Sequence, residues 1–372
     1  MLNFKLQLGI SFCRLKLVIK IIFYWLPFVF GDSVKIGVIF PLTGSSAADV
    51  GIPGQKAVLT GFEIMKKQFP RLSSVKLIFE DAGDSPKQAL SAINKLINVD
   101  KVDVVLSMTT VVASTITGQI NRNQKLHVCY LCWSKEIKTE EDYNFSFDTD
   151  GSLAASFIVD YLKSKGAQSI GILAMNNAFG VTMRSNLEKE FGATSDFFKL
   201  ILSENYNLDE QNFKTLGLKV KNSSIDYLIL AEYRLDYLGR IFDGLTRVNH
   251  RKPVITITVD KVQHETTKLS FPLLNLTYNF NPHGHLVREF VRTHERLYGQ
   301  GPEFDKYPYL GFQIFLIIAE VLEACNYQNS QDCYRQRLVR HTFDTIFGPM
   351  NFTIGGAPVP PIPLTFDNYT KN

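Results

Sequence analysis

Residues 34–89 limit what this chain can fold into more than any other part of it. An apolar run at 34–40 leads into a glycine-containing loop at 41–51, and an amphipathic helix follows. A second apolar run ends at Asp81, and another helix begins near Pro86. Strands that alternate with helices in this way open a doubly wound α/β domain, in which helices cover a parallel sheet.

The alternation of short apolar strands and helices continues to residue 258. Further strands are expected at 104–107, 126–131, 144–147, 169–174, 197–202, 226–230 and 254–258. Helices are expected at 54–69, 179–191, 210–220 and 235–248, and from about 111 and 152. Continuous apolar strands of this length indicate parallel sheets covered on both faces. The chain then changes to three helices and an extended, proline-rich tail, expected at 286–298, 310–325, 334–341 and 347–366.

Length and composition are those of a globular protein with room for two cores. The chain has 372 residues, of which 45% are hydrophobic and 20% are charged. It carries 40 basic and 36 acidic residues, but four of the basic ones precede Asp32, so the rest is neutral overall. Because nucleic-acid binding needs a basic surface, no nucleic-acid partner is expected.

The first 31 residues have the pattern of an export signal. A basic region ends at Lys20, and the uninterrupted apolar run at 21–31 is too short to span a bilayer. Cleavage is expected after Gly31, with an uncleaved N-terminal anchor as the alternative. No later segment reaches the roughly 18 apolar residues of a membrane span. The mature protein is therefore expected to be exported, to the periplasm or the extracellular space, with no membrane span.

The cysteines outside the signal fall into two pairs. Cys325 and Cys333 flank a polar loop, a spacing that suits a local disulfide in an oxidising compartment. Cys129 and Cys132 form a CxxC on an expected strand, where a spacing of three places the side chains on opposite faces. Two buried thiols are therefore favoured over a redox or zinc site.

Motifs for enzyme chemistry are missing from the sequence. It contains no GxxxxGK[ST], GxGxxG or GxSxG, so no phosphate loop, dinucleotide site or nucleophile elbow is expected. His283 and His285 lie in a loop that opens a helix, without acidic or thiol ligands at metal-site spacing. We expect a protein that is not an enzyme and that needs no metal or other cofactor.

The opening segment closely resembles the leucine/isoleucine/valine-binding family of extracytoplasmic solute receptors. The shared features are Pro-Leu-Thr-Gly at 41–44 after the first strand and the Asp-rich segment at 80–84 ahead of a Lys-Gln-Ala helix. The resemblance implies an α/β protein with two doubly wound parallel-sheet lobes of the type I periplasmic binding protein fold. It implies an export signal at 1–31, an N-terminal lobe of residues 32–149 plus 277–345, and a C-terminal lobe of residues 150–276 plus 346–372. Three crossings would join the lobes, near 148–150, 276–281 and 343–349.

Candidate ligand-binding residues of the first lobe follow its strands. Thr109 and Thr110 stand between a strand and a helix, and the resemblance implies that they bind a ligand carboxylate; simple helix capping is the alternative. Trp133 and Ser134 end the next strand, where Trp133 is either a pocket wall or plain core. Asp148 replaces an arginine that the family commonly has at the first crossing, which indicates a ligand other than a standard aliphatic amino acid.

Candidate residues of the second lobe also lie at strand ends. Phe179 matches a family turn that carries an aromatic residue against the ligand, and Tyr233 ends the next strand, where the family again places an aromatic residue. Asp260 is expected to pair with an α-ammonium group, as the family's acidic residue does, and Glu232 competes for that role. The resemblance implies a receptor that captures an amino acid or a similar small polar solute for an ABC importer. The alternative is a sensory or regulatory ectodomain that signals to a partner protein.

Overall fold

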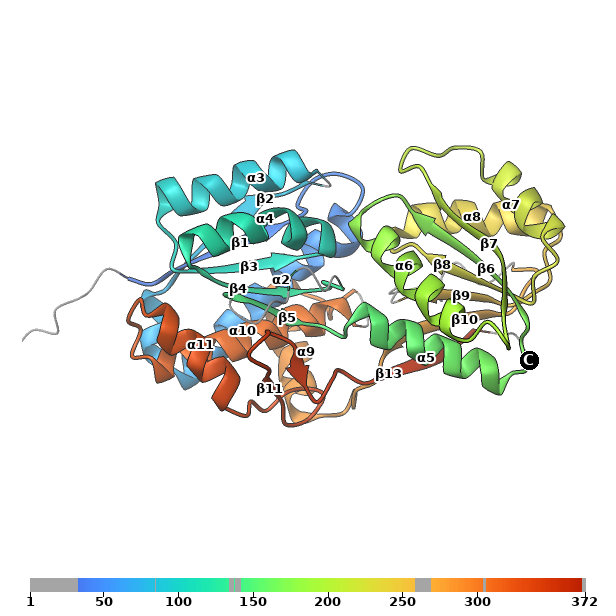
Figure 1. Cartoon of the computed structure of the whole chain (residues 1–372). Helices are drawn as coiled ribbons and strands as arrows, with labels where there is room; N and C mark the ends of the chain where they lie inside the picture. Colours follow the sequence, from blue (N-terminus) through green and yellow to red (C-terminus); the bar gives the residue numbers. More distant parts are fainter. Residues whose placement is uncertain are drawn as a thin grey trace, which may run out of the picture. The chain divides into compact units, whose positions relative to one another are not determined.

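The structure is a computed structural model that describes residues 33–83, 85–133, 137, 142–257, 269–303 and 306–369. The predicted export signal, Ser134 and Asp260 lie outside the described residues. Residues Val34–Asn372 form one compact unit. Within this unit the described residues contain two large sheets and one two-stranded sheet (Figure 1).

The first large sheet is parallel and has the strand order β2-β1-β3-β4-β5. Its strands are β1 (Lys35–Phe40), β2 (Lys76–Asp81), β3 (Val104–Met108), β4 (Leu126–Tyr130) and β5 (Asn144–Phe147). On β1, Ile39 faces a cluster of side chains from α3 (Pro86–Lys95) and α4 (Thr110–Asn123), whereas Val38 faces α2 (Ile52–Gln68) and α10 (Tyr307–Ala324). Successive residues of one strand therefore bury themselves under helices on opposite faces, as a doubly wound sheet requires (Figure 1).

The second large sheet has the order β13-β10-β9-β8-β6-β7, with β13 antiparallel to β10 and the other pairs parallel. Its strands are β6 (Ser169–Met175), β7 (Lys199–Tyr206), β8 (Tyr227–Ala231), β9 (Val254–Ile257), β10 (Leu273–Tyr278) and β13 (Leu364–Asn368). The connecting helices are α5 (Gly151–Ser164), α6 (Ala178–Ala193), α7 (Phe213–Asn222) and α8 (Leu235–Arg247). The alternation predicted from the apolar runs is confirmed up to β9, whereas β10 and β13 were not predicted.

The late helices pack on the first sheet's side of the unit. They are α9 (His285–Tyr298), α10 and α11 (Gln331–Arg340), and short helical turns η1 (Ala47–Gly51), η2 (Pro70–Ser74) and η3 (Leu96–Asp100) complete this region. The rings of Phe62 on α2 and Phe315 on α10 meet edge to face, 5.6 Å apart. By length and composition α10 is the one helix among the described residues that could cross a membrane, but 83% of its apolar window is buried inside the protein. It is therefore the central core helix of this region.

Three segments join the two large sheets, and the bounds of the second and third differ from the expected ones. The first lies between β5 and α5. The second follows Tyr278, because β10 continues through residues that were expected to be the crossing. Residues of the third expected crossing and the hairpin of β11 (Asn351–Phe352) and β12 (Pro358–Val359) remain on the first sheet: Phe352 packs on Phe145 with ring centroids 5.7 Å apart. The passage to β13 therefore falls at 360–363.

The two cysteine pairs differ in state. Cys325 and Cys333 are joined by a disulfide, with Cα atoms 6.0 Å apart, whereas Cys129 and Cys132 are buried thiols outside any disulfide. The expectation that these two thiols occupy opposite faces is wrong. The strand ends at Tyr130 and the next residue turns the chain with a positive φ of 56°, which brings both thiols into one small apolar cluster.

Candidate ligand-binding site

Two neighbouring cavities lie where the parallel strands of both sheets end. The inner cavity has a volume of about 20 Å³, room for about one water molecule. Residues after β3, β4, β6 and β8 line it together with residues from η1 and α10: Val50, Thr109, Thr110, Val111, Leu131, Trp133, Phe179, Tyr233 and Tyr307. Five of the seven predicted ligand-binding residues thus surround one cavity.

The outer cavity has a volume of about 370 Å³, within the range of small-molecule sites. It shares Thr109, Val111 and Tyr233 with the inner cavity. Its other described lining residues are mostly small or polar: Ser45, Ser46, Gly83, Pro86, Val112, Ser114, Thr115, Met175, Asn176, Asn177, Ala178, Leu208, Arg234 and Tyr237. The location agrees with the rule that open parallel sheets bind ligands beyond the carboxyl ends of their strands.

The start of α4 offers hydrogen-bond donors to both cavities. Thr109 is the N-cap, and its hydroxyl accepts a long hydrogen bond of 3.5 Å from the Val112 N–H, so capping does occur. The first N–H groups of a helix have no intrahelical partner and favour an anion. The Thr110 hydroxyl is already used within the protein, since it donates to the Leu131 carbonyl (3.4 Å) and accepts from the Trp133 N–H (3.0 Å). Thr109 is therefore the better placed of the two hydroxyls.

Thr109 also has an unusual backbone, with φ 74° and ψ 146°. A β-branched residue with positive φ is a genuine outlier, and such a conformation costs on the order of 1 to 3 kcal/mol. The surrounding contacts hold it, because the Thr109 N–H donates to the Tyr130 carbonyl at 3.1 Å. The strain therefore sits at the end of β3, beside the cavities.

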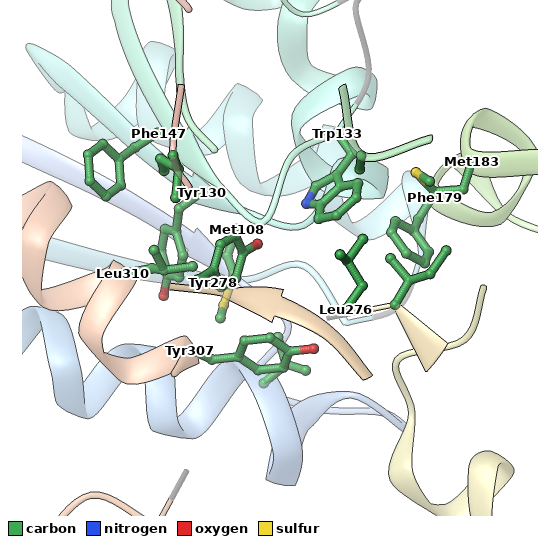
Figure 2. Close-up of a cluster of buried hydrophobic side chains, with 14 of the residues drawn as sticks. Met108, Tyr130, Trp133, Phe147, Phe179, Met183, Leu276, Tyr278, Tyr307 and Leu310 are labelled. Atoms are coloured by element: carbon green, nitrogen blue, oxygen red, sulfur yellow. The ribbon is translucent and has the colours of Figure 1, made fainter. Parts of the chain in front are cut away.

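Three aromatic rings form a row along the inner cavity. The Trp133 and Phe179 centroids are 5.9 Å apart, and those of Phe179 and Tyr233 are 5.6 Å apart, both edge to face. Figure 2 shows Trp133 and Phe179 side by side, although they follow strands of different sheets. Phe179 is held there because α6 approaches β6 closely: a Cβ at Gly180 would lie 2.0 Å from the Met175 carbonyl oxygen. These rings suit an apolar or planar ligand body.

The carboxylate of Glu232 is already bound by other side chains and is not the partner we expect for a ligand ammonium group. Its fully buried carboxylate accepts from Arg234 at Nε (3.0 Å) and at a terminal nitrogen (2.7 Å), and from the Tyr206 hydroxyl (2.5 Å). Burial opposes the Arg234 charge, but the hydrogen bonds and charge of Glu232 raise the Arg234 pKa above its ordinary value. Arg234 is the one charged residue among the described residues that line the outer cavity.

The Asp81 carboxylate organises the loop that follows β1. It accepts from the N–H groups of Leu42 (2.8 Å), Thr43 (3.1 Å) and Gly83 (2.8 Å), and from the Thr43 hydroxyl (2.5 Å). Burial alone would raise the pKa of Asp81, but these hydrogen bonds lower it. Asp81 therefore ties Leu42 and Thr43, which belong to the segment that carried part of the family resemblance, to Gly83, which lines the outer cavity.

A buried polar chain in the first sheet has the connectivity of a hydrolytic triad. The Ser107 hydroxyl lies 2.7 Å from His127 Nε2, and His127 Nδ1 lies 2.7 Å from the Asn144 side-chain oxygen. All three residues are at most 1% exposed, so no substrate reaches the hydroxyl. Burial lowers the pKa of His127 to about 4. The chain satisfies polar groups between β3, β4 and β5, and we assign it a structural role.

Sequence reasoning missed several lining residues. Tyr307 comes from α10, far along the chain, and no local pattern pointed to it. Arg234 was detectable in principle. An acid and a base two residues apart directly follow a buried strand, and charges buried at such a place are stabilised by pairing with each other. Val50 and Leu131 belong to the apolar wall and carry no signal beyond hydrophobicity.

Two helix-covered sheets with cavities at their strand ends, lined by hydroxyls and aromatic rings, define a solute-binding protein. The chain belongs to the periplasmic binding protein family, whose model matches residues 33–359. A comparison with curated proteins found no significant match.

Solved structures show the same fold at low identity. A leucine-binding protein from Thermotoga maritima has a TM-score of 0.74 and 15% identity, over 91% of this chain and 98% of that chain. An ABC-transporter solute-binding protein from R. palustris, in complex with 4-hydroxybenzoate, has a TM-score of 0.77 and 14% identity, over 92% and 94%. An extracellular ligand-binding receptor from Desulfohalobium retbaense has a TM-score of 0.74 and 15% identity, over 90% of this chain but 57% of the receptor. The chain thus spans little more than half of that receptor's length.

Proposed function

We propose that the protein is an exported receptor that captures a small carboxylate-bearing solute between two lobes and delivers it to an ABC importer. The observation that carries the proposal is that residues at the strand ends of both sheets line one cavity, beside a second of about 370 Å³. The two lobes are the two sheets with their helices, and residues 346–359 stay with the first lobe rather than the second. Leucine and 4-hydroxybenzoate, the ligands named for two similar structures, both carry a carboxylate.

Each predicted residue has a place in this proposal. The ligand carboxylate meets Thr109 and the free N–H groups at the start of α4, while Thr110 fixes that turn. Phe179 and Tyr233 contact the ligand body from the second lobe. Trp133 supplies a further part of the cavity wall. Ser134 and Asp260, which lie outside the residues that the structure describes, are proposed to make polar contacts with the ligand. With Glu232 bound to Arg234, Asp260 is the acid we propose for an ammonium group.

Calorimetry with matched ligand pairs tests this function. We would compare leucine with 4-methylpentanoate, phenylalanine with 3-phenylpropanoate, and benzoate with 4-hydroxybenzoate. A member of at least one pair should bind in a 1:1 ratio, and Thr109→Ala should weaken it by on the order of 1 to 2 kcal/mol, because the backbone donors remain. If an amino acid is preferred, Asp260→Asn should weaken it by roughly 30-fold or more. No binding of any acid would count against the proposal.

A sensory or regulatory ectodomain is the second candidate. The similarity to a longer receptor, of which this chain covers 57%, favours it, since that protein has the same fold as one part of a larger chain. Uptake of the labelled solute by cells that lack the protein separates the two candidates. Loss of uptake supports a transporter subunit, whereas unchanged uptake with loss of a response to the solute supports a sensor.

Export is part of both candidates. The basic region and apolar run at 1–31 support a cleaved signal, so the mature chain should begin at or near Asp32. N-terminal sequencing of soluble exported protein tests this, and recovery of intact Met1 would refute cleavage.

A further inference from the structure

Asp148 lies at the first crossing, between β5 and α5, and is fully buried. One carboxylate oxygen accepts from the Trp133 indole Nε1–H at 2.9 Å. The other accepts from the Tyr278 hydroxyl at 3.0 Å and from the Thr149 N–H at 2.7 Å. A single carboxylate therefore joins a side chain of the cavity wall to the backbone and side chains of the crossings.

The partners of this carboxylate and of its neighbour lie on all three crossings. Tyr278 is the last residue of β10, immediately before the second crossing. Thr149, next to Asp148, donates its hydroxyl to the Ile362 carbonyl at 2.7 Å, and Ile362 lies in the passage to β13. The three segments that join the two sheets are thus held together at the first crossing.

Trp133 depends on this site for its orientation. An indole has one hydrogen-bond donor, and Asp148 occupies it. The ring is 1% exposed and meets Phe179 of the second sheet across the inner cavity, at 5.9 Å. Burial, and then the charge of Asp148, raise the pKa of Tyr278 well above its ordinary value, so the Tyr278 hydroxyl keeps its proton and donates. Figure 2 shows Trp133, Tyr278 and Tyr307 in one cluster of buried side chains, and Tyr307 also lines the cavity.

We infer that Asp148 is a positioning residue: it holds the Trp133 indole in the cavity wall and, through Tyr278, ties that wall to the crossings. The functional meaning of this inference rests on the proposed function. A ligand that contacts Trp133 would, through Asp148, affect the segments about which the two lobes move. Removing a buried carboxylate with three donors leaves those donors unsatisfied, so Asp148 governs the geometry of the wall and of the hinge together.

The indole proton of Trp133 gives a direct readout that needs no ligand. The chain has two tryptophans, Trp25 in the predicted signal and Trp133. In the full chain with Trp25→Phe, one indole resonance remains, and its hydrogen-exchange rate can be followed by NMR. Each variant's unfolding constant is measured in urea, so that exchange through global unfolding is accounted for.

Asp148→Asn keeps the side-chain size and one accepting oxygen but loses the charge. It should speed indole exchange by about tenfold or more beyond the change in the unfolding constant, because a hydrogen bond to a charged acceptor is lost. Tyr278→Phe, which removes one hydroxyl, should speed exchange by about threefold beyond that change, as a weaker loss of support.

Thr149→Val is the matched control, because it removes a buried hydrogen bond at the same crossing without touching the indole. It should speed exchange only as much as it raises the unfolding constant. If Asp148→Asn behaves like this control, the indole is held by packing alone and the inference is overturned. If Asp148→Asn does not fold, the Tyr278→Phe variant decides. If its indole exchanges no faster than its unfolding constant predicts, the tie between the cavity wall and the crossings is refuted. Failure of every acid to bind would refute the proposed function and leave this comparison intact.

Discussion

His127 should make the protein less stable in mild acid by an amount that the structure defines. The imidazole is fully buried between Ser107 and Asn144, and burial lowers its pKa from 6.5 to about 4. Below pH 6.5 the His127 imidazole takes up a proton in the unfolded chain but stays neutral in the native state. Stability is therefore unaffected by this group above pH 6.5 and falls as the pH drops from 6.5 toward 4. Between pH 7 and 4.5 the loss amounts to about 2.5 kcal/mol.

Urea unfolding of the parent and of His127→Gln at pH 7, 6, 5 and 4.5 isolates this effect. At pH 7 the variant should be less stable by about 1 to 3 kcal/mol, because its amide cannot serve both neighbours equally well. The difference should then shrink by about 2.5 kcal/mol at pH 4.5, since the variant has no imidazole to titrate. Burial also lowers the pKa values of His250, His294 and His341, but these groups titrate in both proteins and cancel. A difference that stays constant over this range would refute the reasoning.

Three further perturbations follow from the site and the disulfide. Glu232→Gln leaves the buried Arg234 charge uncompensated and should cost about 3 to 5 kcal/mol in urea unfolding, whereas Glu232→Gln combined with Arg234→Met should recover part of that loss. Thr109→Gly should be more stable than Thr109→Ala by roughly 1 kcal/mol, the reverse of the usual order, because only glycine adopts positive φ without strain. Reduction of the Cys325–Cys333 disulfide should lower stability by about 2.5 kcal/mol for so short a loop; equal unfolding curves with and without reductant would contradict this.

The sequence predicted the strands of the two sheets well where each strand was a continuous apolar run. It failed at β10, where buried Asn275 and Thr277 interrupt the apolar pattern. These residues are buried because their polar groups find partners in the sheet: the Thr256 hydroxyl donates to the Asn275 side-chain oxygen at 3.0 Å. It also failed at β13, because the prolines of the tail indicated only extended chain. Because β13 pairs antiparallel to β10, it stands outside the alternation of parallel strands and helices on which the prediction relied.

The candidate site was predictable in position and not in detail. Parallel strands end at one edge, so Thr109, Phe179 and Tyr233 could be placed at strand ends, and the family resemblance placed them in one site. The contacts of Thr110 and Glu232 could not, because they depend on which side chains the two sheets bring near. An acid after a strand looks the same in sequence whether it meets a ligand ammonium or a neighbouring arginine.

Several energetically costly features lie at the carboxyl-terminal edge of the sheets. A strained Thr109, a left-handed Leu131, a buried Asp148 and the buried Glu232–Arg234 pair all follow strands at their carboxyl ends. Each lowers stability relative to an unstrained or apolar alternative. Such costs beside the two cavities are expected if this edge is shaped for a ligand, since groups fixed before binding lose less freedom when the ligand arrives.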